Sequence, residues 1–196
     1  MKPNITGKIS IIISGPAAVG KTTLAASLAS EFDLKLYNGG DILKSIAEKE
    51  GYDVEGTDWW DTSKAAKFMK ERKRNSIFDR KVDQKLIDIS NKGNVVITSH
   101  TLPWLTSYPI KFWLSASQEN RSKRMAKRDG ISLKEALMIV KLRDEENKKI
   151  YGKIYGAEIG KELSVFDFVL NTEILTLNSL TNLCKDITNN IIWKYK

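Results

Sequence analysis

The sequence predicts an α/β fold, a three-layer sandwich in which helices cover both faces of a five-stranded parallel sheet. Three observations lead to this prediction. Five apolar runs have the length and the β-branched or aromatic content of buried strands, helical patterns fill the gaps between them, and a glycine-rich loop follows the first run. The runs cover residues 8–14, 34–37, 94–99, 110–114 and 165–170. In such a sheet, ligands bind at the carboxyl ends of the strands.

The glycine-rich loop lies between the first strand and an apolar helix, and its spacing is Gly-x4-Gly-Lys-Thr. This spacing lets successive backbone N–H groups surround phosphate oxygens at a helix N-terminus, which carries partial positive charge. Lys21 can reach the terminal phosphates, and the Thr22 hydroxyl can coordinate Mg²⁺. The loop therefore predicts binding of a nucleoside triphosphate. The residues expected to contact it are Gly15, Pro16, Ala17, Ala18, Val19, Gly20, Lys21, Thr22 and Thr23.

The composition is that of a soluble globular protein, with 196 residues, 41% of them hydrophobic and 29% charged. The one cysteine, Cys184, excludes a disulfide within the chain and fits a reducing compartment. No apolar stretch reaches the roughly 20 residues of a membrane span, and the N-terminus lacks the apolar segment of a signal peptide. We expect a cytoplasmic protein that acts as a monomer and has no membrane partner.

Positive charge is concentrated in one segment of the chain. The formal net charge is +8, and residues 64–85 contain nine basic and three acidic residues, a net charge of +6. Such a run suits a polyanion, although a solvated helix face is the commoner explanation. Binding of nucleic acid is therefore the minority interpretation.

Two segments between strands are longer than a simple crossover requires. The first, about residues 58–92, is expected to bind an acceptor. The second, about residues 117–163, is rich in Arg and Lys and is expected to form a helical lid, with a new helix beginning at Ser132 in a capping box with Glu135. The remaining core of this single domain, residues 1–196, then comprises about residues 1–57, 93–116 and 164–196.

Two inserts around one cleft fit phosphoryl transfer from the triphosphate to a small acceptor. Such transfer needs positioning, Mg²⁺ and cations around the moving phosphoryl group, and little covalent work by side chains. Lys21, Arg128 and Arg143 are the predicted catalytic cations, and Arg124 is a further candidate. Closure of the lid would exclude water that could otherwise hydrolyse the donor.

The chain resembles the archaeal type of cytidylate kinase, a nucleoside monophosphate kinase of the phosphate-loop class, nearly from end to end. The family fold is a five-stranded parallel sheet with a monophosphate-binding insert and a lid. The resemblance implies ATP as donor, CMP or dCMP as acceptor, and ADP and the nucleoside diphosphate as products. Besides the phosphate loop, it is carried by residues 39–44, 78–83, 93–97, 110–114, 124–131, 143–144, 155–156 and 165–172.

The same resemblance implies roles for individual residues. Asp41 and Lys44 would lie at the monophosphate site, Arg80 and Asp83 would hold the acceptor nucleotide, and lid arginines would clamp phosphates. Those lid arginines are Arg128 and Arg143.

The chain departs from the family pattern at the acceptor site. After the third strand, Thr98-Ser99-His100 replaces an acidic residue, a glycine and an arginine. Lys44, Gln84 and Ile150 also stand where the family often has arginine. We hypothesise that Asp41 takes over the support of Mg²⁺ from the missing carboxylate at position 98. The departures leave open a kinase with a different small-molecule or nucleotide acceptor. The basic segment of residues 64–85 leaves open a second alternative, a nucleotide-dependent RNA-binding protein.

Two further side chains are candidates for the acceptor site. Trp59, next to Trp60, is predicted either to stack on a base or to pack in the core. His100, the one histidine, is predicted to hydrogen-bond the acceptor phosphate, with capping of a strand end as the alternative.

Overall fold

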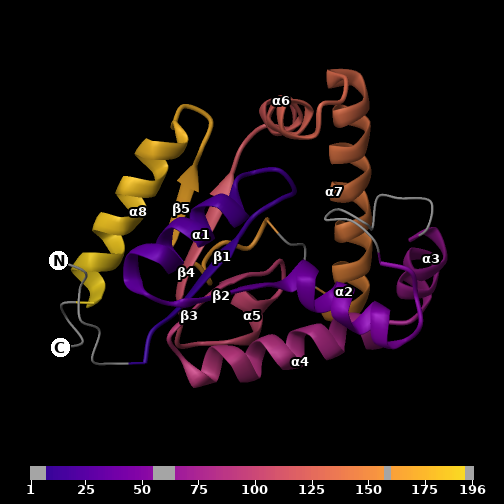
Figure 1. Ribbon diagram of the computed structural model, residues 1–196, viewed down its shortest axis with the longest axis horizontal. Coiled ribbons are helices and arrows are strands. Elements are labelled where there is room, and N and C mark those ends of the chain that lie inside the picture. The colour runs from indigo at the N-terminus through magenta and orange to yellow at the C-terminus, as the bar shows by residue number, and fades with distance from the viewer. Residues whose placement is uncertain (1–7, 55–64, 157–159, 193–196) are drawn as a thin grey trace.

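The computed structural model describes residues 8–54, 65–156 and 160–192 (Figure 1). Within this part of the chain, a five-stranded parallel sheet has the order β2-β3-β1-β4-β5. The predicted α/β fold is therefore confirmed. The fifth strand begins three residues later than the apolar run suggests. The strands are β1 (Ser10–Ser14), β2 (Lys35–Asn38), β3 (Val95–Thr98), β4 (Ile110–Ser115) and β5 (Phe168–Asn171).

The register of the strands aligns their carboxyl ends. Ile13 of β1 lies opposite Thr98 of β3, and Ser14 lies opposite Trp113 of β4. Asn38 of β2 also lies opposite Thr98. The loops that leave β1, β2 and β3 therefore begin along one edge, which is where a parallel sheet of this kind binds ligands.

Helices bury both faces of the sheet. Along β1, Ile11 and Ile13 pack with helices α1 (Lys21–Phe32) and α8 (Leu177–Ile192), whereas Ile12 packs on the opposite side. This alternation is the two-residue period of a strand, and it makes β1 apolar throughout. The helices on the Ile12 side are α2 (Gly39–Lys49), α3 (Ala66–Arg74), α4 (Ile77–Lys92) and α5 (Leu102–Leu105).

The segment after β4 forms two helices, α6 (Gln118–Asp129) and α7 (Leu133–Tyr155). Gly130 ends α6 with a φ of 67°, and the Ser132 hydroxyl accepts a hydrogen bond from the Glu135 N–H at 3.2 Å, as the predicted N-cap requires. Helix α7 runs past α6 and reaches α3 and α4 at its far end (Figure 1).

A buried polar cluster fastens the far end of α7. The Arg72 side chain of α3 is 8% exposed and donates to Asp79 of α4, with 2.7 Å between Nη2 and Oδ1 and 3.1 Å between Nε and Oδ2. Arg72 also donates to the hydroxyl of Tyr151 on α7 at 3.2 Å. A second contact joins Lys73 of α3 to Glu146 of α7. These contacts join α7 to α3 and α4, which lie far from it in the sequence.

Removal of the Asp79 charge should destabilise the fold strongly. Asp79→Asn leaves the Arg72 guanidinium buried without its counter-charge, so we expect a loss of about 3–5 kcal/mol in the free energy of unfolding. Tyr151→Phe should cost about 1 kcal/mol, since it removes one hydrogen bond. Urea denaturation followed by circular dichroism measures both. The exposed pair of Lys123 and Glu119 is the control, and Glu119→Gln should cost less than about 1 kcal/mol. Equal losses for Asp79→Asn and Glu119→Gln would contradict the account.

Candidate active site

The glycine-rich loop joins β1 to the N-terminus of α1 and lies close against β4. Gly15 has a φ of 143°, and a Cβ at this position would lie 2.3 Å from the Leu114 carbonyl oxygen. Gly20 has a φ of 106°, and Ala18 also has a positive φ of 58°. The first glycine is therefore needed for both its backbone angle and the close approach of the loop to the sheet.

Lys21 lies folded over its own loop. Its ammonium donates to the carbonyl oxygens of Gly15 at 2.9 Å and Pro16 at 2.8 Å. Burial, together with the positive charges of Arg143 and Arg121, lowers the pKa of Lys21 to about 7, and the negative charge of Asp144 opposes this shift. The adjacent Thr22 is exposed in the first turn of α1. Lys21 is thus a cation whose charge is easily lost until an anion stabilises it.

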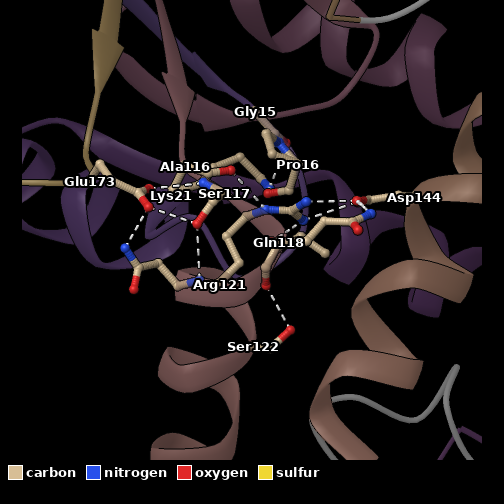
Figure 2. A network of polar contacts seen from close by, with 12 residues as sticks. Gly15, Pro16, Lys21, Ala116, Ser117, Gln118, Arg121, Ser122, Asp144 and Glu173 are labelled. Atoms are coloured by element: carbon tan, nitrogen blue, oxygen red, sulfur yellow. Dashed lines mark hydrogen bonds and ion pairs between the residues drawn. The ribbon is translucent and has the colours of Figure 1, made fainter. Parts of the chain in front are cut away.

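Two arginines of α6 contact the loop through its backbone carbonyls. Arg121 is 4% exposed and donates to the Ala17 carbonyl oxygen at 3.1 Å, and it forms an ion pair with Asp144 of α7 at 2.6 Å (Figure 2). Arg124 donates to the Val19 carbonyl oxygen at 3.3 Å and to the carbonyl oxygen of Thr172 at 2.7 Å. Arg124, a sequence candidate for stabilising phosphate charge, therefore binds backbone. Arg121 was missed because nothing in the basic run distinguishes it from its neighbours.

The two predicted lid cations lie in different environments. Arg143, one residue before Asp144 on α7, is partly buried, and its charge contributes to the lowered pKa of Lys21. Arg128 is exposed near the end of α6 and forms an ion pair with Asp129 at 2.6 Å. Arg143 also contributes to the lowered pKa of Asp129, after the hydrogen bond and charge of Arg128. Both arginines thus act on a neighbouring group, but the contribution at Lys21 comes from Arg143.

His100 lies between the phosphate loop and the polar cluster of α3, α4 and α7. Its ring stacks on Tyr151, with 5.9 Å between ring centroids and 29° between planes. Burial, and then the charges of Lys21, Arg72 and Arg143, hold the pKa of His100 well below its usual value of 6.5. At neutral pH the imidazole is uncharged, so it can offer a hydrogen bond to a ligand but no positive charge.

Asp83 on α4 is 5% exposed and has hydroxyl partners for both oxygens. Oδ1 accepts from Thr101 at 2.5 Å, and Oδ2 accepts from the hydroxyl of Tyr155 at the end of α7. Burial raises the pKa of Asp83, and these two hydrogen bonds oppose the rise. Arg80, about one turn before Asp83 on α4, is exposed, although its charge acts on Tyr155. Sequence reasoning missed Arg72, Thr101, Tyr151 and Tyr155, because their partners lie on other elements.

Asp41 is exposed in the first turn of α2 and is connected to the end of β3 through Asn38. The Asn38 amide donates to Asp41 Oδ2 at 2.9 Å, and its oxygen accepts from the Thr98 hydroxyl at 2.9 Å. Lys44 is partly buried one turn further along α2. The structure thus connects Asp41 to the position where the family carries its acidic residue. Trp59 and Trp60 lie outside the described residues.

Among residues 8–54, 65–156 and 160–192, no helix is long and apolar enough to cross a membrane. The same ranges contain no group of three or more His, Cys, Asp or Glu residues placed to hold a metal ion.

Solved structures with the same arrangement include shikimate kinases. The enzyme from Bacteroides thetaiotaomicron aligns with a TM-score of 0.57 over 94% of this chain and 99% of its own length, at 14% identity. The enzyme from Aquifex aeolicus aligns with a TM-score of 0.53 over 94% of this chain and 99% of its own length, at 18% identity. At such low identities the likeness shows the shared fold.

Relatives found by sequence have higher identity to this chain than these solved structures do. A cytidylate kinase of Pyrococcus horikoshii is 34% identical over 166 residues, which are 84% of this chain and 80% of the relative. A cytidylate kinase of Pyrobaculum aerophilum is 34% identical over 188 residues, covering 94% of this chain and 96% of the relative. The model of the cytidylate kinase-like family matches residues 10–174. The chain is therefore a member of the cytidylate kinase-like family.

Proposed function

We propose that the protein transfers the terminal phosphoryl group of ATP to CMP or dCMP, giving ADP and the nucleoside diphosphate. The observation that carries this proposal is that positive charges from two different elements act on one side chain, His100. Lys21 of the phosphate loop and Arg143 of α7 both lower the pKa of His100, which stacks on the helix cluster holding Asp83. This arrangement supports a site in which a donor cation and a lid cation lie near two of the predicted acceptor groups, His100 and Asp83.

On the donor side, the loop amides would bind the phosphates, and Lys21 would exchange its carbonyl partners Gly15 and Pro16 for phosphate oxygens. Arg128 and Arg143 would stabilise the charge that spreads over the transferred phosphoryl group. The residues fit Mg²⁺, because the exposed Thr22 hydroxyl and the Asp41 carboxylate are oxygen ligands. When bound, the ion would neutralise phosphate charge.

On the acceptor side, Asp41 and Lys44 would lie at the monophosphate, and Arg80 and Asp83 would hold the nucleotide. His100 would donate one hydrogen bond to the acceptor phosphate as a neutral imidazole. We keep the predicted division into a core, an acceptor insert and a lid as part of this proposal. We also propose that the protein works as a monomer in the cytoplasm.

A second function, RNA binding that depends on nucleotide, is favoured by one surface. Lys81, Lys85 and Lys92 of α4 line an open groove of about 440 Å³. However, Lys81 pairs with Glu50, and Arg72 from the same basic run is buried against Asp79. Filter binding of a single-stranded RNA at two salt concentrations tests this function, since phosphate contacts weaken steeply with salt. Undetectable binding at low salt eliminates it.

The proposed reaction is tested with ATP, Mg²⁺ and a panel of acceptors: CMP, dCMP, UMP, AMP, GMP, shikimate and a polyol. We expect CMP or dCMP to give the highest kcat/KM. Lys21→Met should lower that value by at least about 10²-fold, because it removes a cation from the charge that develops in transfer. Lys123→Met, which changes an exposed lysine of α6, is the matched control. Turnover of shikimate or the polyol with no nucleotide turned over would replace the proposal with a different acceptor.

Binding of MgATP should weaken as the pH rises above 7. In the free protein Lys21 has a pKa of about 7, whereas bound phosphate favours its charged form. Binding above pH 7 must therefore take up a proton, and the affinity should fall by up to about tenfold per pH unit. His100, with a pKa well below 6.5, does not change charge in this range. Calorimetry in buffers of different ionisation enthalpy measures the proton uptake. Lys21→Met should remove it, and uptake that persists in this variant would assign it to another group.

Asp83→Asn should impair the acceptor selectively. Loss of a charged hydrogen-bond partner of about 1.5–3 kcal/mol corresponds to an increase of about 10- to 150-fold in the KM for CMP. The KM for ATP should change by less than about twofold. Asp88→Asn, an exposed substitution on the same helix, is the control. A parallel rise in both KM values would show that Asp83 acts on the fold and not on the acceptor.

A further inference from the structure

We infer that Arg121, oriented by Asp144, is a positioning residue for the phosphate loop. It fixes the peptide between Ala17 and Ala18 from the outer side of the loop. This inference deepens the proposed function on its donor side, and it does not depend on which acceptor is used.

Arg121 connects several elements of the fold. Its guanidinium donates through Nη1 to the Ala17 carbonyl oxygen at 3.1 Å and through Nε to the Ala116 carbonyl oxygen at 3.2 Å. Asp144 receives both remaining contacts, at 3.0 Å and 2.6 Å. One side chain thus connects the phosphate loop, the end of β4 and helix α7 (Figure 2).

The contact of Arg121 with the Ala17 carbonyl oxygen also sets the direction of the next N–H group. In a trans peptide the C=O and N–H groups point in opposite directions. Because Arg121 holds the Ala17 carbonyl oxygen, the N–H of Ala18 must point away from Arg121. Ala18 has a φ of 58°, in the left-handed region, and such residues in succession with right-handed ones form concave anion sites from their N–H groups. The contact therefore selects the orientation that such a site needs.

The backbone conformation of Ala18 is itself unfavourable. A left-handed conformation costs a residue with a Cβ about 1–2 kcal/mol, so the surrounding structure must hold it. The hydrogen bond from Arg121 to the preceding carbonyl is a contact that does so. Arg124 repeats the arrangement two peptides later, where its contact with the Val19 carbonyl oxygen orients the N–H of Gly20.

Asp144 allows the buried guanidinium of Arg121 to hold the loop beside the positive charge of Lys21. The charge of Arg121 lowers the pKa of Lys21 and that of Asp144 raises it, so the pair limits repulsion at the loop. The two parallel contacts also fix the plane of the guanidinium, which a lysine ammonium cannot reproduce. The Gln118 amide donates to the same carboxylate at 3.0 Å and helps to orient it.

The test is direct binding of MgATP and, separately, of CMP by calorimetry to the full chain carrying Arg121→Lys or Asp144→Asn. We expect ATP affinity to fall about tenfold or more in each variant, since a charged hydrogen bond is removed. CMP affinity should change by less than about twofold. The double variant should lose no more than the larger single loss, because both changes break one pair. Arg74→Lys, on the exposed side of α3, is the control.

A second readout separates positioning from general stability. In two-dimensional NMR, the amide signal of Ala18 should shift on addition of ADP in the wild-type protein and should shift less in Arg121→Lys. Equal losses of ATP and CMP binding, an unchanged ATP affinity, or a general loss of folding would each overturn the inference. If the wild-type protein binds ATP but phosphorylates none of the acceptors, the proposed function fails while this inference stays tested.

Discussion

The gathering of positive charge around the phosphate loop is the constraint on which the structure depends. Burial, together with the nearby charges of Arg143 and Arg121, lowers the pKa of Lys21 to about 7. Charges buried together need counter-charges, because desolvation in a low-dielectric interior is unfavourable. Asp144 meets this need at the loop, and Asp79 does so for Arg72. The positive charge that remains at Lys21 favours the binding of a polyanion.

Helix α7 is the element that joins the proposed donor half of the site to the proposed acceptor half. Asp144 lies behind the phosphate loop, and Tyr155 contacts Asp83 on α4. Tyr155 follows Asp144 by eleven positions, which corresponds to about 16 Å along the helix. Tyr151, between them, contacts both Arg72 and His100. A displacement of α7 would therefore alter the loop carbonyl of Ala17 and the carboxylate of Asp83 together, which makes the helix a structural link between the two proposed substrates.

Short sequence patterns predict those features of the fold that depend on interactions between residues near one another in the sequence. The five strands follow from β-branched runs, the phosphate loop from its glycines, and the start of α7 from the Ser132 cap. The end of α7 is less local, because burial of Tyr151 carries the helix through Gly152 to Tyr155. Arg72 could not be found in a basic run, because its partner Asp79 lies on another helix. The proposed acceptor site was least predictable, since Thr101 and Tyr155 reach Asp83, and Tyr151 reaches His100, only through tertiary contacts.

In the proposed reaction, one cleft holds a nucleoside triphosphate and a nucleoside monophosphate side by side. Binding of a bisubstrate analogue, in which adenosine and cytidine are joined through five phosphates, measures this most directly. Calorimetry should show that the analogue binds at least about tenfold more tightly than ATP alone, because linked groups occupy adjacent sites without a second loss of freedom. An analogue that binds no more tightly than ATP, and leaves CMP binding unaffected, would contradict the account.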